Sequence, residues 1–218
     1  MMLPFERPRA VQTLAPGAVR VPAWLDERAQ RGLVAACREW ARPPAGMHQT
    51  KVGSGVMSVR TVCLGWHWYP YRYSRTVDDH GGAAVKPFPD WLGELGRRAV
   101  SAAGLAAGYE PDVAVINYYG GAAKMGLHQD RDELSRAPIV SLSLGDTGVF
   151  RFGNTGSRGR PYTDIELLSG DLFVFGGVSR MAFHGITRIV PGTSPLPELD
   201  GRLNLTLRES GLRWADTP

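Results

Sequence analysis

The chain has 218 residues, of which 43% are hydrophobic and 21% charged, a composition typical of a soluble globular protein of one domain. It contains no apolar run near the ~18 residues that indicate a membrane span, and its first residues lack the apolar stretch of a secretory signal. Its two cysteines, Cys37 and Cys63, suit a reducing compartment, so we expect a cytoplasmic protein. We also expect a monomer that has no membrane partner.

The chain is basic, with a net charge of +4 and an isoelectric point near 9.3. Lysine occurs only at positions 51, 86 and 124, so nearly all the positive charge is arginine. A GC-rich genome would produce this bias, and so would a polyanionic partner, because the arginine fork matches phosphate oxygens. Charge alone does not separate the two explanations.

The first half of the chain predicts two helices. Residues 1–24 hold several prolines and little periodicity, which predicts an irregular arm. Residues 26–42 are predicted to be a helix with Asp26 as N-cap, because apolar side chains recur at helical spacing until Pro43-Pro44. The same spacing predicts a second helix over residues 90–107.

An aromatic cluster lies between the two predicted helices, in the glycine-rich segment 46–89. Residues 57–64 predict a strand, and residues 66–73 alternate rings with polar groups around a turn. The pattern fits a hairpin with one aromatic face packed on the core. It also fits a platform that stacks a planar ligand, with arginines at its edge for phosphates.

Short strand-like segments separated by turn signals fill the rest of the chain. The predicted strands are Val113–Tyr119, Ile139–Leu144, Val149–Phe152, Ile165–Leu168, Leu172–Phe175, Ala182–Ile189 and Leu203–Leu207. Helices first and many short strands later predict an α+β chain with a jelly-roll core.

Three residues in this second half have the chemistry of a metal site. His128 and Asp130 project to the same side of an extended chain, and His184 follows further along. A lone His-x-Asp is usually a polar turn, so the prediction depends on the second histidine. Two histidines and one carboxylate form the facial triad of non-haem Fe(II) oxygenases, which leaves open positions for substrate and oxygen.

The last predicted strand has an apolar face of three leucines and an opposite polar face. The polar face carries Arg202, Asn204, Thr206 and Arg208. Buried cations need partners, so arginines that face the interior would suit a dicarboxylate ligand. The alternative is an exposed edge strand with its charges outward. Asn117 and Tyr119 share a face of an earlier strand, where an amide and a phenol can hydrogen-bond a carboxylate.

Five motifs follow one another along the second half of the chain. They are Asn117-x-Tyr119, His128-Gln-Asp130-x-Asp132, Ala137-Pro-Ile-Val-Ser-Leu-Ser-Leu-Gly145, Gly176-Gly…Ser179-Arg180…His184-Gly-Ile186 and Arg202-x-Asn-Leu-Thr-x-Arg208. With these motifs in this order, the chain resembles the bacterial AlkB family of Fe(II)- and 2-oxoglutarate-dependent dioxygenases, which repair DNA and RNA. The similarity runs from about residue 10 to 213 and is strongest over 111–210.

The resemblance implies a double-stranded β-helix with N-terminal helices, in a single domain over residues 1–218. Residues 111–210 would form the catalytic core and residues 45–90 a nucleotide-recognition lid. It implies that the catalytic iron ligands are His128, Asp130 and His184. It implies a 2-oxoglutarate site in which Arg202, Asn117 and Tyr119 hold the distal carboxylate, while Asn204 and Arg208 lie near the metal-chelating end.

The resemblance also implies a pocket for the damaged base. The residues assigned to it are Met57, Trp66, Tyr71, Tyr73 and Asp132. Trp66 is matched through Leu64-Gly65-Trp66, and the tyrosines through Tyr-x-Tyr-Ser. The segment between Trp66 and Tyr71 differs in length from the family's.

The implied activity is oxidative demethylation of N-alkylated bases, of the 1-methyladenine and 3-methylcytosine type, in single- or double-stranded DNA or in RNA. It requires Fe(II), 2-oxoglutarate and O2, converts the cosubstrate to succinate and CO2, and releases the methyl group as formaldehyde. Two alternatives stay open. The first is the same oxygenase chemistry on RNA, protein or a small molecule, and the second is a non-catalytic metal-binding jelly-roll module.

Overall fold

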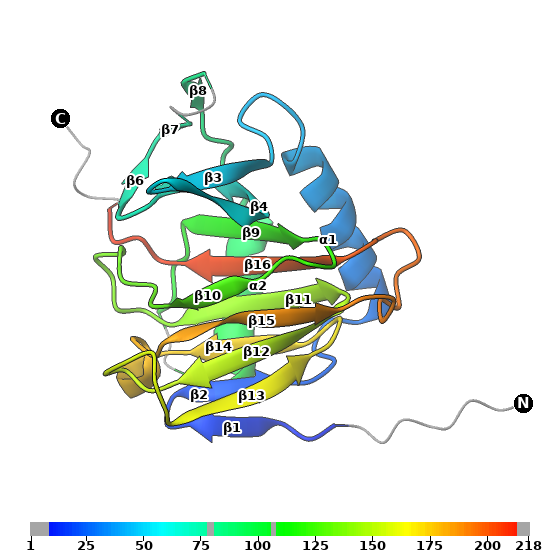
Figure 1. The fold of residues 1–218 in the computed structure, drawn as a ribbon, viewed down its shortest axis with the longest axis vertical. Helices are drawn as coiled ribbons and strands as arrows, with labels where there is room; N and C mark the ends of the chain where they lie inside the picture. Colours follow the sequence, from blue (N-terminus) through cyan, green and yellow to red (C-terminus); the bar gives the residue numbers. More distant parts are fainter. Residues whose placement is uncertain (1–8, 78–80, 106–107, 213–218) are drawn as a thin grey trace, which may run out of the picture.

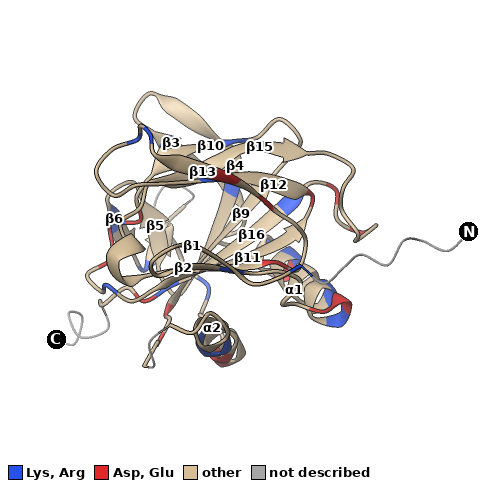
Figure 2. Cartoon of the chain, turned by 90° about the horizontal axis from the view of Figure 1, so that it is seen from below, with Lys and Arg blue, Asp and Glu red and all other residues tan. Residues whose placement is uncertain are grey.

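Two antiparallel sheets face each other in the computed structural model, which describes residues 9–77, 81–105 and 108–212 (Figures 1 and 2). The larger sheet has eight strands. In order across the sheet they are β1 (Gln12–Ala15), β2 (Ala18–Val21), β14 (Leu172–Phe175), β11 (Ile139–Gly145), β16 (Arg202–Arg208), β9 (Val113–Tyr119), β4 (Gly55–Leu64) and β3 (His48–Val52).

The smaller sheet has four strands and covers one face of the larger sheet. In order they are β10 (Met125–His128), β15 (His184–Val190), β12 (Thr147–Gly153) and β13 (Tyr162–Leu167). A short 3-10 turn, Gly177–Ser179, precedes β15. The expected jelly-roll core is confirmed, and most predicted strands differ from the observed ones by only a few residues at their ends.

The two faces of the larger sheet differ because side chains alternate along each strand. The leucines of β16 point outward, where α1 (Glu27–Trp40) and α2 (Asp90–Ala102) complete an apolar layer (Figure 2). The intervening residues of β16 face the smaller sheet and are all buried. Since β16 lies between β11 and β9, the edge-strand alternative is wrong.

Both predicted helices are present with small differences at their ends. The Asp26 side chain accepts a hydrogen bond from the Ala29 amide at 2.7 Å, which caps α1 as expected. The second helix was expected to reach residue 107, but α2 ends at Ala102. Gly104 then adopts a φ of +67°, a left-handed conformation that stops a helix. None of the described helices has the length and apolar character needed to cross a membrane.

The expected irregular arm is wrong for the described part of residues 1–24, which forms the hairpin β1–β2. Gly17, at φ +77°, provides the turn, and β2 pairs with β14. The hairpin is fixed by Asp171, more than 140 residues later, which accepts hydrogen bonds from Arg9, Arg20 and the Ala23 amide. Residues 1–8 lie outside the described part of the chain.

The segment 45–90 divides into two parts. Strands β3 and β4 belong to the larger sheet. The remainder forms two small hairpins, β5 (His67–Tyr69) with β6 (Arg72–Ser74), and β7 (Thr76–Val77) with β8 (Ala83–Ala84). Residues 78–80 are outside the described residues. The expected aromatic hairpin is therefore confirmed at β5–β6.

Asp171→Asn should destabilise the protein at neutral pH, because it leaves two arginines around a neutral buried amide. Removing one partner of a buried ion pair costs about 3–5 kcal/mol. Burial alone would raise the pKa of Asp171, but hydrogen bonds from Arg9, the Ala23 amide and Arg20 outweigh it and hold the pKa below its ordinary value. The carboxylate thus stabilises the fold above its unfolded pKa of about 3.9, and this is lost as the pH falls through the folded pKa.

Urea unfolding at pH 7 and at pH 3 measures both effects, and the difference between wild type and variant should shrink at the lower pH. Asp164→Asn is the matched control, because Asp164 also pairs with an arginine, Arg151, but at the surface. Exposed pairs contribute little. Equal costs for the two variants at pH 7 would contradict the role given to Asp171.

Candidate active site

The two histidines and the aspartate meet at the ends of neighbouring strands. His128 ends β10 and His184 begins β15, and the two are direct partners in the antiparallel register. The carboxylate oxygens of Asp130 lie 3.6 Å from His128 Nε2 and 3.5 Å from His184 Nε2. One ligand atom from each residue lies within 4.8 Å of the others, a spacing that suits a single metal ion.

Backbone carbonyls orient both imidazoles toward this point. Nδ1 of His128 lies 2.9 Å from the Gly126 carbonyl oxygen, and Nδ1 of His184 lies 2.9 Å from that of Ala182. A carbonyl only accepts, so each Nδ1 carries the proton and each Nε2 presents its lone pair to the cluster. Such outer hydrogen bonds fix the tautomer of metal-binding histidines.

The charges of the triad are those of a metal-binding set. Burial alone would raise the pKa of Asp130, but the Arg208 guanidinium at 2.8 Å and the two imidazoles outweigh it and hold the pKa well below its ordinary value. Burial, reinforced by His184, lowers the pKa of His128 to about 4. At neutral pH the protein therefore offers an ionised carboxylate and a neutral imidazole, the forms that bind a metal.

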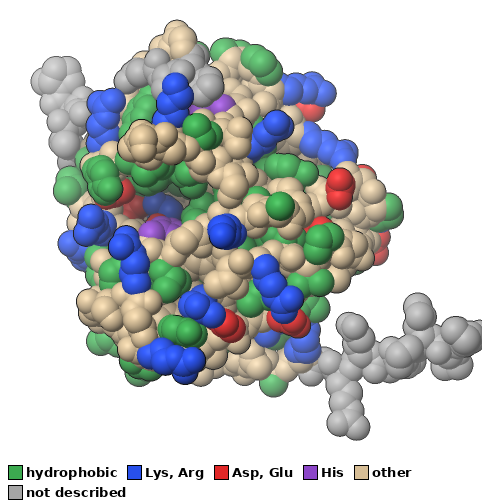
Figure 3. Space-filling model, in the orientation of Figure 1, with side chains coloured by type: hydrophobic (Ala, Val, Ile, Leu, Met, Phe, Trp, Pro, Cys, Tyr) green, Lys and Arg blue, Asp and Glu red, His purple; other side chains and the backbone are tan. Residues whose placement is uncertain are grey.

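A cavity of about 660 Å³ opens from the triad to the surface. Figure 3 shows a hollow on this face in which histidine is visible, with basic side chains around its mouth. Its inner wall includes Asn117, Tyr119, Ser141, Phe175, Ile186, Asn204 and Arg208. Its outer wall includes Met57, Trp68, Tyr71, Arg131, Asp132 and Arg158.

Arg202 is a buried cation that lacks a charged partner. Its side chain is fully buried, and among the described residues it forms no ion pair. Nη2 donates to the Ser143 hydroxyl at 2.9 Å, whereas Nε has no hydrogen-bond partner in the part of the chain that the structure describes. Burial lowers its pKa to about 10. A buried cation is costly without an anion, so this site fits the distal carboxylate of 2-oxoglutarate.

Two amides expected at 2-oxoglutarate line the inner wall of the cavity: Asn117, expected at the distal carboxylate, and Asn204, expected near the metal-chelating end. Asn204 and Asn117 are direct cross-strand partners, as are Arg202 and Tyr119. The Asn204 amide donates to the Ser141 hydroxyl, and the Asn117 carbonyl accepts from Thr61, so both are held in fixed orientations. The structure thus brings the expected cosubstrate residues together on β9 and β16.

Of the residues expected at the base pocket, Met57, Tyr71 and Asp132 line the cavity. Trp66 does not, so the expectation that it contributes a wall of the pocket is wrong. It is 4% exposed and donates through Nε1 to Asp112 at 3.2 Å. Trp68 occupies the expected place: it lines the cavity, and its Nε1 donates to Asp132 at 2.8 Å.

Tyr73 also lies outside the residues that line the cavity. Its hydroxyl donates to Glu133 and accepts from Arg208 Nη1 at 3.2 Å. Glu133 in turn pairs with Arg180 at 2.9 Å. The sequence prediction includes Trp68 only in the possible stacking platform of residues 66–73. It gives Glu133 and Arg180 no role, although Glu133 follows the metal-binding motif directly and Arg180 lies in a matched motif.

Comparisons with known proteins agree with this geometry. The model of the 2OG-Fe(II) oxygenase superfamily matches residues 17–208. A Caulobacter vibrioides protein named "Alpha-ketoglutarate-dependent dioxygenase AlkB homolog" is 40% identical over 210 residues, 91% of this chain and 90% of the relative. The Arabidopsis thaliana "DNA N(6)-methyladenine demethylase ALKBH1D" is 33% identical over 229 residues, 90% of this chain and 50% of the relative. The solved structure of OsALKBH1 has a TM-score of 0.85 at 30% identity, covering 92% of this chain and 100% of that chain.

Arg202→Met should weaken 2-oxoglutarate binding without loss of stability. Affinity, measured by calorimetry in the presence of Mn(II), should fall at least about ten-fold, which corresponds to ~1.4 kcal/mol. The melting temperature of the metal-free protein should stay equal or rise, because a buried charge without a partner is replaced by an apolar chain of similar length. Arg188→Met is the control, since Arg188 is exposed on β15. An unchanged affinity for 2-oxoglutarate would rule out the assigned role.

Proposed function

Because the chain belongs to the AlkB family of 2OG-Fe(II) oxygenases, we propose that this dioxygenase is an oxidative demethylase of N-alkylated bases in DNA. The observation that carries the proposal is the cavity that joins the triad to an outer wall with two aromatic rings and one carboxylate. In it Trp68 and Tyr71 provide ring faces, and Asp132 provides a carboxylate.

Separate groups of residues would bind the metal ion and the cosubstrate. His128, Asp130 and His184 would hold Fe(II). Asn117 and Tyr119, which line the cavity, would hold the distal carboxylate of 2-oxoglutarate with the buried Arg202. Asn204 and Arg208 would lie near its metal-chelating end. Bound there, Fe(II) with 2-oxoglutarate and O2 supplies an oxidant that inserts one oxygen atom into a C–H bond while the cosubstrate becomes succinate and CO2. The N-hydroxymethyl group formed on a cationic base then loses formaldehyde and a proton, which leaves the neutral, unmethylated ring nitrogen.

The outer wall favours a positively charged base. A cation is attracted to the faces of Trp68 and Tyr71 and to the Asp132 carboxylate, and cation–π contacts contribute about 0.5–2 kcal/mol. The bases 1-methyladenine and 3-methylcytosine carry a positive charge, whereas N6-methyladenine, named for the Arabidopsis relative, is neutral. A base in a duplex must be flipped out to enter the cavity, which costs less at a damaged pair.

The mouth of the cavity suits a polyanionic chain. Arg131 and Arg158 line it and are exposed. Arginine at such a position can form bidentate hydrogen bonds with phosphate. This supports the polyanionic-partner explanation of the arginine excess, with DNA as the proposed partner and RNA as the alternative within the same chemistry. The non-catalytic module is not supported, since the chain belongs to an enzyme family and contains an arginine that needs an anionic ligand.

We also propose that the enzyme acts as a monomer in the cytoplasm. The triad and the cavity are complete within one chain. Both cysteines are buried and neither forms a disulfide in the described part of the chain, which suits a reducing compartment. Within one oxygenase domain of residues 1–218, residues 111–210 would form the core and residues 45–90 the lid. The hairpin β5–β6 contributes the ring of Trp68 to the cavity.

A panel of methylated oligonucleotides tests this function. Single-stranded DNA, duplex DNA and RNA that carry 1-methyladenine, 3-methylcytosine or N6-methyladenine would be incubated with Fe(II), 2-oxoglutarate and O2, and formaldehyde and succinate measured. The kcat/KM for the two cationic bases in DNA should exceed that for N6-methyladenine by about ten-fold or more, or ~1.4 kcal/mol. Succinate without formaldehyde from every oligonucleotide would reject nucleic acid as the substrate.

Trp68→Ala should lower the affinity for the oligonucleotide, whereas Trp66→Ala should lower the stability of the protein. Base-on-ring stacking contributes roughly 1–3 kcal/mol, so Trp68→Ala should weaken binding of a 1-methyladenine oligonucleotide about ten-fold with little change in melting temperature. Trp66→Ala should instead lower the melting temperature, because truncating a buried tryptophan costs about 3–5 kcal/mol. Fluorescence anisotropy and thermal unfolding of both variants distinguish the two roles. Loss of affinity in Trp66→Ala alone would place the base elsewhere.

A further inference from the structure

The small hairpin β5–β6 contacts the metal-binding loop through two adjacent side chains. Trp68 on β5 and Tyr73 on β6 are direct cross-strand partners. The Trp68 indole donates to Asp132, and the Tyr73 hydroxyl donates to Glu133. These acceptors follow the metal ligand Asp130 by two and three residues, so the hairpin rests on the loop that carries the ligand.

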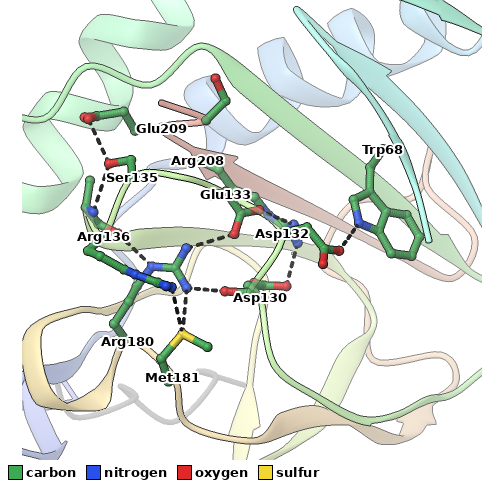
Figure 4. Close-up of polar contacts among 12 residues, drawn as sticks. Trp68, Asp130, Asp132, Glu133, Ser135, Arg136, Arg180, Met181, Arg208 and Glu209 are labelled. Atoms are coloured by element: carbon green, nitrogen blue, oxygen red, sulfur yellow. Dashed lines mark hydrogen bonds and ion pairs between the residues drawn. The ribbon is translucent and has the colours of Figure 1, made fainter. Parts of the chain in front are cut away.

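The contact made by Tyr73 continues to the metal ligand itself. Oε1 of Glu133 accepts from Tyr73 and also from Arg208 Nη1, at 2.9 Å. The other nitrogen of that guanidinium, Nη2, donates to Asp130 Oδ1 at 2.8 Å. Figure 4 shows Asp130, Glu133 and Arg208 facing one another, with Trp68 reaching Asp132 from the other side. Hydrogen bonds therefore connect the hairpin to the metal-binding carboxylate without a gap.

The charges of this network balance without the tyrosine. Arg180 donates to Glu133 Oε2 at 2.9 Å and to the carbonyl oxygens of Asp130 and Ala137. The side chains of Asp130, Glu133, Arg180 and Arg208 are each less than 10% exposed, and their two positive and two negative charges cancel. The Tyr73 hydroxyl is not needed for neutrality. Its contribution is to orient Glu133 and Arg208.

The hairpin is also held by packing on the larger sheet. Trp68 and Tyr73 pack against the buried side chains of Cys63, Trp66, Val113 and Val115, and the Trp68 amide donates to Cys63 Sγ at 3.5 Å. Among the described strands, β5 and β6 pair only with each other and form a sheet of their own. A two-stranded hairpin alone is marginally stable in water. Its contacts with the loop, through Trp68 and Tyr73, therefore act together with this packing to hold it over the cavity.

We propose that Tyr73 is a positioning residue that couples the hairpin to the metal site. With the hairpin closed, its hydroxyl holds Glu133 and Arg208 so that Arg208 directs the Asp130 carboxylate toward the histidines. Because coupling between two sites is reciprocal, binding of a metal ion that fixes the Asp130 side chain also favours the closed hairpin. The lid and the metal site thus stabilise each other before any substrate is present. This inference goes beyond the proposed function, because it holds for whatever substrate the cavity accepts.

Tyr73→Phe tests the coupling, because it removes the hydroxyl, keeps the ring and leaves the buried charges balanced. Amide hydrogen exchange of residues 67–74 would be measured on the full chain, without nucleic acid, in the absence and presence of Mn(II) with 2-oxoglutarate. In the wild type the ligands should slow exchange about five-fold or more, the lower end of typical coupling between sites. In Tyr73→Phe the slowing should fall below about two-fold.

Reciprocity supplies a second readout. If Tyr73→Phe reduces the ligand-induced slowing of amide exchange by a given factor, it should weaken Mn(II) binding, measured by calorimetry, by a similar factor. Tyr118→Phe is the matched control: it removes a hydroxyl that donates to the Asp200 carbonyl oxygen on the outer side of the sheet, and it should behave as wild type in both measurements.

Three results would overturn the proposal. One is wild-type exchange that does not respond to Mn(II) and 2-oxoglutarate, and another is a Tyr73→Phe variant that responds as wild type does. If the variant's hairpin exchanges fast under both conditions, Mn(II) affinity decides: a fall supports the coupling, and an unchanged value refutes it. Because no oligonucleotide is used, failure here is separate from failure of the proposed demethylation.

Discussion

The site depends on how the fold compensates the two cations that β16 carries into the space between the sheets. The outward leucines of this strand fix its orientation, so Arg202 and Arg208 must face inward. Arg208 meets Asp130 and Glu133, and this pairing is what keeps the metal-binding carboxylate ionised and in place. At the other end of the strand, the hydrogen bonds that Arg202 forms within residues 9–77, 81–105 and 108–212 go to hydroxyl and carbonyl oxygens.

This asymmetry explains the order of groups along the cavity. An arginine already paired with the ligand loop lies at the metal end, and Arg202, which has no ion-pair partner among the described residues, lies at the end where we propose that the carboxylate binds. Asn117 and Asn204 lie between them on neighbouring strands, with their amides held by Thr61 and Ser141. The protein carries a buried charge that costs stability until a ligand compensates it, and function is the reason to retain such a charge.

Much of the site could be predicted because it depends on local geometry. Because side chains alternate along an extended chain, His128 and Asp130 are predicted to project to the same side. The same alternation predicts that the arginines and leucines of the last strand lie on opposite faces. Contacts between distant parts of the chain could not be predicted this way: the hairpin β1–β2 is fixed by Asp171, far along the sequence. Motif matching predicts that Trp66, and not Trp68, reaches the base. Which ring reaches the cavity depends instead on the turn at Gly65 (φ +76°) and on the length of the hairpin. No sequence spacing reveals either.

A crystal structure grown without oxygen, with Mn(II), 2-oxoglutarate and a 1-methyladenine oligonucleotide, tests the central claim most directly. The account predicts one ion bound by His128, Asp130 and His184, the distal carboxylate paired with Arg202, and the methylated base against Trp68 and Asp132 with its methyl group toward the ion. A carboxylate bound away from Arg202, or a base placed outside this cavity, would contradict it.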